Sequence, residues 1–271
     1  MARVLSRAAI QGLRGSLRIL RGAPRLLVFD FDGTLSPLAR RPEAARISAG
    51  AARALRILRA QKGTVVAVLS GRSLGSLRRM LPKGLILVGN HGLRASRRGL
   101  GLEPNALSPY RATLRSRIVP LRKLAAGVPG ALVEGKGVGA ALHYRAVAAV
   151  HVPDLLKAAL LLFRGSGFRA RAGKKVLEFV PPVGQGKAGG LRRLSEALAP
   201  GWRRAGACLF VGDDLTDEDA FRAARALGKR ALAIKVGPGP TAAALRLVSR
   251  SGVDDLLDAV ASFPRGNGRR T

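Results

Sequence analysis

Residues 26–35 read LLVFDFDGTL, and this stretch predicts both the fold of the chain and its chemistry. The four apolar residues Leu26–Phe29 are typical of a short strand that is buried on both faces of a parallel sheet. Two acids follow, Asp30 and Asp32, and Gly33 then allows the chain to turn. In open parallel sheets, ligands bind just beyond the strand ends where these carboxylates lie.

A second acidic cluster lies about two-thirds of the chain further on. Residues Gly212–Asp219 read GDDLTDED and follow the apolar run Ala207–Val211. The chain has 48 basic and 16 acidic residues, a net charge of +32, and nine of those acids lie in or beside a few short motifs. A chain so poor in acid that gathers carboxylates at strand ends indicates a cation site, and therefore a metal-dependent enzyme.

Apolar strands alternate with helices on both sides of a central insertion, which predicts a parallel sheet covered on both faces. The strands are expected at Leu26–Asp30, Thr64–Leu69, Leu85–Val88, Ala207–Val211 and Ala231–Val236. The helices between them are expected at Ala51–Lys62, Leu74–Leu81, Lys187–Leu198 and Asp217–Leu227.

The rhythm changes between residues 104 and 180, where hairpin and helix patterns predict a small inserted α+β domain. Its expected elements are helices at Tyr110–Ala126 and Asp154–Phe163, a hairpin of Ala131–Glu134 with Val138–Tyr144, and a strand at Lys175–Val180. The predicted fold is thus α/β, with a Rossmann-like parallel-sheet core at residues 25–103 and 181–262. Residues 1–24 are expected to form a basic leader, and residues 263–271 a disordered tail.

Composition excludes several classes of protein. Cys208 is the single cysteine, which rules out an internal disulfide and a Cys-ligated zinc site and fits a reducing, cytoplasmic location. No apolar run approaches the ~18 residues that a membrane span needs. The basic, acid-free first 29 residues leave organellar targeting or surface binding open.

The positive charge has two interpretations. It could indicate a polyanionic partner, or it could be compositional, since arginines are spread along the whole chain rather than gathered on one element. No nucleic-acid motif is present, and only 4% of the residues are aromatic, which is few for base stacking. We therefore expect no specific nucleic-acid binding, and we expect a monomer.

The carboxylates have the residue types that phosphoryl transfer needs. A carboxylate can attack phosphorus if a cation removes the repulsion between the two anions. Asp30 is the candidate nucleophile, and Asp32 is the candidate general acid and base. Asp213 and Asp214 end another strand and can complete an oxygen-rich Mg²⁺ shell.

Two further side chains extend this site. Ser70 ends the second strand and can donate a hydrogen bond to a phosphoryl oxygen. Lys187 begins a helix after a glycine-rich loop, a position that repels cations unless an anion lies nearby. Both residues are therefore expected to contact the phosphate.

These motifs resemble the phosphatases of the haloacid dehalogenase superfamily, with DFDGT, Ser70, Lys187 and GDDLTD in order. More narrowly, the chain resembles the trehalose-6-phosphate phosphatase family from Leu26 to Ser262. The segments that carry this are Asp30–Leu38, Ser70–Arg72, Gly89–Gly92, Glu134–Lys136 with His143–Arg145, Val176–Glu178 and Asp213–Phe221.

The resemblance implies a Mg²⁺-dependent hydrolysis of trehalose 6-phosphate, with the insertion acting as a cap over the sugar. The cap residues implied to bind substrate are Glu134, Lys136, His143 and Glu178, of which the two glutamates and the lysine would hold trehalose hydroxyls. The residues implied to face the sugar-phosphate end are Arg72, Asn90, His91, Gly92 and Arg145.

The resemblance also implies which atoms bind the metal. Asp30 and Asp213 would bind Mg²⁺ by their side chains and Asp32 by its backbone carbonyl. Asp217 would orient either the metal site or Lys187.

The sequence departs from the family pattern at two places. Gly135 replaces an acid of the cap motif, and Ala188 replaces the glycine after the catalytic lysine. Lys174 or Lys175 could in principle replace Lys187. Another sugar phosphate, such as sucrose 6-phosphate or a mannosyl phosphate, is an alternative substrate, and an inactive module that binds anionic polymers is an alternative of another class.

Overall fold

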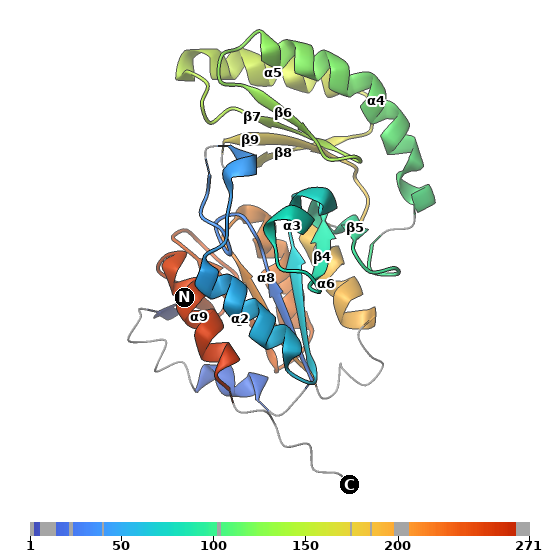
Figure 1. Cartoon of the computed structure of the whole chain (residues 1–271). Coiled ribbons are helices and arrows are strands. Elements are labelled where there is room, and N and C mark those ends of the chain that lie inside the picture. The colour runs from blue at the N-terminus through green and yellow to red at the C-terminus, as the bar shows by residue number, and fades with distance from the viewer. Residues whose placement is uncertain are drawn as a thin grey trace. The chain divides into compact units, whose positions relative to one another are not determined.

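The computed structural model describes residues 3–5, 15–21, 24–39, 41–101, 104–173, 175–184, 186–197 and 206–263. The chain divides into two compact units, of which the first comprises Met1–Gly101 with Gln185–Thr271 and the second Leu102–Gly184. The first unit is a doubly covered, mostly parallel sheet, so the predicted α/β class is confirmed (Figure 1).

The sheet of the first unit has eight strands, and the two acidic motifs follow its two central neighbours. The order is β1 (Arg3–Leu5), β12 (Leu245–Leu247), β11 (Ala231–Val236), β10 (Ala207–Gly212), β2 (Arg25–Phe29), β3 (Thr64–Leu69), β4 (Ile86–Gly89) and β5 (Arg94–Ala95). All neighbours are parallel except β4 and β5. Because β2 pairs with both β10 and β3, the carboxyl ends of these three strands lie side by side.

Alternation along each strand sends successive side chains to opposite faces of the sheet. In β2, Leu27 and Phe29 pack with one set of helices, and Leu26 and Val28 pack with the other. The first set is α2 (Ala49–Ala60), α3 (Leu74–Met80) and α9 (Ser251–Ala261), and the second is α6 (Gly186–Ala197) and α8 (Leu215–Ala226). Short 3₁₀ turns in this unit are η1 (Ser16–Leu20), η2 (Pro42–Ala44) and η3 (Asn90–Gly92).

The second unit is an antiparallel sheet with both of its helices on one face, as Figure 1 shows. The sheet order is β6 (Leu132–Gly135), β7 (Ala140–His143), β9 (Val176–Val180) and β8 (Arg169–Gly173), and the helices are α4 (Pro104–Ala126) and α5 (Val152–Phe163), with the turn η4 (Ala149–His151) before α5. Leu142, Leu177 and Phe179 pack against the helices. The intervening residues of these strands therefore point to the opposite, helix-free face.

The sequence predicts a basic leader over residues 1–24, and the structure describes parts of this segment. Arg3–Leu5 pairs in parallel with β12 as an edge strand. Leu17 and Leu20 are fully buried in the core beside α9, because their spacing places both on one face of the 3₁₀ turn. The sequence predicts a disordered tail at residues 263–271, but Phe263 is buried in the core of the first unit. Residues 264–271 lie outside the described residues.

Among the described residues, no helix is both long enough and apolar enough to cross a membrane.

Candidate active site

Asp30 and Lys187 form the centre of the site in the first unit. Asp30 follows β2 and is 3% exposed, and Lys187 begins α6 and is 4% exposed. The ammonium nitrogen Nζ of Lys187 lies 2.8 Å from Oδ1 of Asp30 and 2.7 Å from Oδ1 of Asp217. Residues 157 positions apart in the sequence are thus joined by a buried ion pair, which provides the anion expected beside a lysine at a helix start.

Asp217 connects the lysine to the second acidic motif. It is the third residue of α8, fully buried, and its Oδ2 accepts hydrogen bonds from the backbone nitrogens of Asp213 at 3.1 Å and Asp214 at 3.0 Å. Gly212 makes this approach possible, because a side chain at that position would overlap the Asp217 carboxylate. Asp217 therefore orients Lys187 and also fixes the backbone of the second acidic motif.

Three carboxylates meet in this place with the geometry of a cation site. Oxygens of Asp30, Asp213 and Asp217 all lie within 4.8 Å of one another. Three carboxylates and one ammonium leave a charge of −2 in a buried volume, which a divalent cation would neutralise. Gly33 has a φ of +80°, and a Cβ there would occupy the space that the Asp213 carboxylate fills. The donor set and this cradle fit Mg²⁺, which prefers oxygen ligands.

Asp214 has a different place from the one predicted. The sequence predicts it as a metal ligand, but its Oδ1 accepts the backbone nitrogen of Leu215 at 2.7 Å and caps α8. Its carboxylate is absent from the group of three acids described above. A helix N-cap needs an acceptor at this position, and that need accounts for the second aspartate of the motif.

Burial changes the proton affinities of the central pair. Burial raises the pKa of Asp30, the carboxylates of Asp217 and Asp213 raise it further, and Lys187 opposes them. Burial alone would lower the pKa of Lys187, but Asp217 and Asp30 outweigh it and raise the pKa, so the ammonium stays charged. A cation among these acids would favour the ionised form of Asp30, which a nucleophile requires.

Arg72 binds Asp32, a contact that the sequence did not predict. Its Nε and Nη2 donate to the two oxygens of the Asp32 carboxylate, each at 2.7 Å. Nη1 donates to the backbone oxygen of Pro42, also at 2.7 Å, and the guanidinium lies over the Phe31 ring. The predicted substrate residue Arg72 is 6% exposed and holds the predicted general acid.

The loop at the end of β4 adds three predicted residues to the same edge. Asn90 and His91 both have a φ of 54°, and they are 4% and 6% exposed. The backbone nitrogen of His91 donates to the backbone oxygen of Ser70 at 2.9 Å, which fixes the loop beside β3. Gly92 lies against the start of α6, where a Cβ would be 2.7 Å from the oxygen of Gly186. Two left-handed non-glycine residues in one loop are strain that functional sites often retain.

The predicted sugar-binding residues lie together on the helix-free face of the second unit. His143 Nε2 is 3.2 Å from Oε2 of Glu134, and Lys136 makes an ion pair with Glu178. Arg171, which the sequence missed because β8 has no apolar run, stands opposite Glu178 in the register.

Arg145 follows β7 and is half-buried. Of the possible substitutes for Lys187, Lys175 belongs to this second unit, and Lys174 lies outside the described residues.

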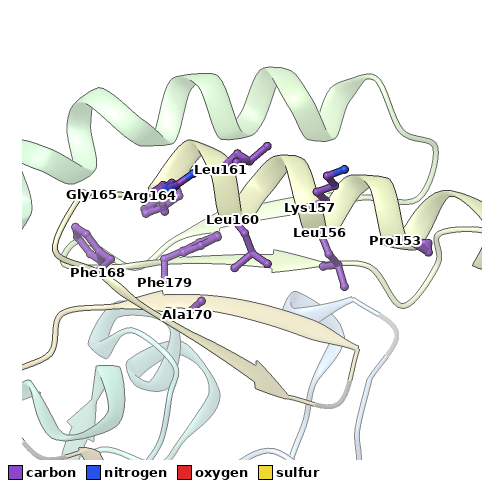
Figure 2. A pocket seen from close by; sticks show the side chains of 11 residues that line it. Pro153, Leu156, Lys157, Leu160, Leu161, Arg164, Gly165, Phe168, Ala170 and Phe179 are labelled. Carbon is purple, nitrogen blue, oxygen red and sulfur yellow. The ribbon is translucent and has the colours of Figure 1, made fainter.

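A separate apolar cavity of about 640 Å³ lies along α5, in the second unit. Figure 2 shows Leu156, Leu160 and Leu161 on the helix, with Phe168 and Phe179 beside them. None of the described residues predicted for the site lines it, and its lining has no carboxylate. This cavity is therefore distinct from the acidic cluster of the first unit.

Comparison with known proteins shows the family of the chain. The family model for trehalose-phosphatase matches residues 28–250 of the chain. The chain belongs to the trehalose-phosphatase family. The match runs from β2 through the whole second unit to the residue before α9, so it includes every predicted site residue.

Two kinds of curated relative are similar to the chain. It is 39% identical over 223 residues to an uncharacterized glycosyl hydrolase of Mycobacterium tuberculosis, covering 78% of this chain and 16% of that protein. It is 34% identical over 271 residues to the trehalose-phosphate phosphatase of Mycolicibacterium paratuberculosis, covering 96% of this chain and 68% of that one. The chain thus spans about one-sixth of the length of the first two curated relatives that it matches.

A solved structure of a trehalose-6-phosphate phosphatase related protein has the same fold. It superposes with a TM-score of 0.75 at 25% identity, covering 87% of this chain and 96% of that one. This chain and that protein therefore share the same fold.

Proposed function

We propose that the chain is a Mg²⁺-dependent phosphatase that hydrolyses trehalose 6-phosphate to trehalose and inorganic phosphate. The contact of Lys187 with both Asp30 and Asp217, beside the carboxylate of Asp213, carries this proposal. It gathers a nucleophile, a fixed positive charge and a cation site at one sheet edge. Family membership supports the same reaction.

In the first half of the proposed reaction, a carboxylate oxygen of Asp30 attacks phosphorus. The bond between phosphorus and the sugar oxygen breaks, and Asp32 gives a proton to that leaving oxygen. Lys187 stabilises the charge that builds on the phosphoryl oxygens, and Ser70 donates a hydrogen bond to one of them.

In the second half, water attacks the phosphorus of the aspartyl-phosphate. Asp32 accepts a proton from this water, and the bond between phosphorus and the Asp30 oxygen breaks to release phosphate. Asp32 is then protonated again, as the first step requires.

Mg²⁺ held by Asp30, Asp213 and the backbone carbonyl of Asp32 would act as a Lewis acid on the phosphoryl group. Both oxygens of Asp217 already accept hydrogen bonds, from Lys187 and from two backbone nitrogens. We therefore assign Asp217 to orientation of the site and not to the metal.

We propose that the polar face of the second unit recognises the sugar. Glu134, Lys136, His143 and Glu178 place paired acids and bases on one sheet face, and sugar hydroxyls need such planar polar partners. We also propose that the protein is a monomer and that it is cytoplasmic. The free thiol of Cys208 fits a reducing compartment such as the cytoplasm.

The deciding experiment measures phosphate release from trehalose 6-phosphate with Mg²⁺ and with a chelator. We expect Mg²⁺-dependent turnover that Asp30→Asn abolishes while the protein stays folded. Asp258→Asn is the matched control, because Asp258 is an exposed aspartate of α9. Turnover by Asp30→Asn at the wild-type rate would exclude Asp30 as the nucleophile. Faster hydrolysis of sucrose 6-phosphate or a mannosyl phosphate would change the substrate and leave the chemistry intact.

A further inference from the structure

Lys235 is a buried charge for which the proposed reaction has no use. It is the one charged residue of strand β11, whose sequence is ALAIKV. Its side chain is buried, with 5% exposed. Its Nζ donates to the backbone oxygen of Asp213 at 2.8 Å. In the sheet, Lys235 stands opposite Gly212, the residue before Asp213. The ammonium therefore anchors the backbone of a proposed metal ligand from the neighbouring strand.

Glu218 supports this lysine from behind. Its Oε1 lies 3.9 Å from Nζ of Lys235, and its Oε2 accepts the backbone nitrogen of Ala242 at 2.7 Å. Glu218 is 7% exposed, so both charges are out of water. We call this chain of contacts, from Asp213 through Lys235 and Glu218 to Ala242, the Lys235 strut. It ties the backbone of Asp213 to α8 and to the loop after β11.

Stability is a weak reason for such an arrangement. Replacing a buried ion pair with apolar side chains of similar volume is often neutral or stabilising. A buried lysine in the sheet and a buried glutamate in α8 therefore indicate a task that apolar residues would not perform. Only a donor can hold the oxygen of Asp213 at hydrogen-bonding distance.

The carboxylate of Asp213 has little freedom, so the backbone of this residue must be held in the one position that suits it. It fills the space over Gly33, where any side chain would overlap it. Asp217 fixes the nitrogen of Asp213, and Lys235 fixes its oxygen. With both ends of the residue held, the carboxylate is aimed at Asp30 before any cation binds.

We propose that Lys235, supported by Glu218, is a positioning residue that orients Asp213 for divalent-cation binding. This inference rests on the metal-dependent function proposed above. Partners that hold a ligand in place typically change metal affinity about 10- to 100-fold when they are mutated. We expect an effect of that size when the Lys235 ammonium is removed.

The test measures Mg²⁺ binding by titration calorimetry, and Mn²⁺ binding by electron paramagnetic resonance, to the full chain well below its unfolding temperature. Lys235→Met keeps most of the side-chain length and removes the donor, so affinity should fall about 10- to 100-fold. Glu218→Gln keeps an acceptor for Ala242 and the donor on Lys235, so it should bind Mg²⁺ nearly as wild type does. Equal affinity of wild type and Lys235→Met would overturn the proposal.

Two further variants separate position from stability. Arg25→Met removes another buried basic side chain, bonded to Thr64 and Gln61 at the opposite end of β2. It should lower the unfolding temperature and leave Mg²⁺ affinity unchanged.

The double variant Lys235→Met with Glu218→Gln removes the stranded carboxylate and serves if the single variant does not fold. It should still bind Mg²⁺ weakly, and recovery of wild-type affinity would show that charge imbalance, not position, was the cause. Metal binding needs no sugar substrate. A wild type that binds Mg²⁺ but leaves trehalose 6-phosphate intact would therefore refute the proposed function and leave the strut standing.

Discussion

The guanidinium of Arg72 donates two hydrogen bonds of 2.7 Å to the carboxylate of Asp32, one to each oxygen. Such a bidentate pair fixes both the direction and the plane of a carboxylate, which a lysine does not do. The guanidinium is itself held by the oxygen of Pro42 and lies over Phe31. The predicted general acid thus has a fixed orientation before substrate arrives.

We expect Arg72→Lys to lower turnover of trehalose 6-phosphate by about 10²-fold, the lower end of what general acid–base catalysis contributes. A sugar alkoxide is a poor leaving group and needs the proton, whereas p-nitrophenolate does not. Turnover of p-nitrophenyl phosphate should therefore fall much less, as steady-state rates with both substrates would show. Equal losses on both substrates would mean that Arg72 acts on the phosphate and not through Asp32.

Asp30→Asn should stabilise the metal-free protein at neutral and higher pH. Burial raises the pKa of Asp30 above its ordinary value, so the folded protein binds this proton more tightly than the unfolded chain does. Protonation of Asp30 therefore contributes to the free energy of unfolding. That contribution is present below the ordinary pKa and is lost as the pH rises through the raised pKa. Thermal unfolding should be measured with a chelator at pH 5 and pH 8. The unfolding temperature of the variant relative to wild type should be higher at pH 8 than at pH 5. A constant difference at both pH values would contradict this.

Gly33→Ala should weaken both folding and Mg²⁺ binding, because the new methyl group would overlap the Asp213 carboxylate. Gly99→Ala is the matched control, since Gly99 has the same φ of +80° but has no atom within 4 Å of a new Cβ. Both variants carry the strain of a left-handed alanine, about 1 kcal/mol. The loss of Mg²⁺ affinity in calorimetry should appear in Gly33→Ala alone.

Glu178→Gln should reduce kcat/KM for trehalose 6-phosphate about 10- to 100-fold, the value of one hydrogen bond to a charged group. It also removes the ion-pair partner of Lys136. A small aryl phosphate has no sugar to contact, so its hydrolysis should be nearly unchanged. Parallel losses on the two substrates would refute sugar recognition by this face.

Cys208 should be inert in the native protein. It is 1% exposed, and burial raises the pKa of its thiol to about 12. Since the thiolate is the reactive form, labelling with iodoacetamide at pH 8 should be very slow. Denaturant should release it at once, and fast labelling of folded protein would contradict the burial. The stabilising contribution of this raised pKa is fully present below the ordinary pKa of a thiol and is lost as the pH rises through about 12.

Local patterns in the sequence were sufficient to predict the core. Apolar runs such as Thr64–Leu69 coincide with β3, and the carboxyl ends of β2 and β10 bring Asp30 and Asp213 together as expected. Strands buried on both faces leave a continuous signal that needs no tertiary information. The segments that were missed lack it, because β8 reads RARAG and β12 has only three residues.

Side-chain partners were harder to predict than positions. Asp214 and Asp217 both have the chemistry of a metal ligand, and only the geometry of α8 shows that the first caps the helix. Arg72 and Asp32 are 40 residues apart, and no periodicity connects them. Lys235 did leave a signal, since a lone lysine in a buried strand needs a partner.

Asp217 also sets a limit on how the molecule fails. The same carboxylate closes the first turn of α8 and holds Lys187 against Asp30. Helix ends are the first parts of a fold to fray, and fraying here would release the lysine while the sheet stays intact. Phosphatase activity should therefore be lost at a temperature below that of cooperative unfolding, and cooling should restore it. The first turn of α8 would then limit the temperature range of activity without limiting the stability of the fold.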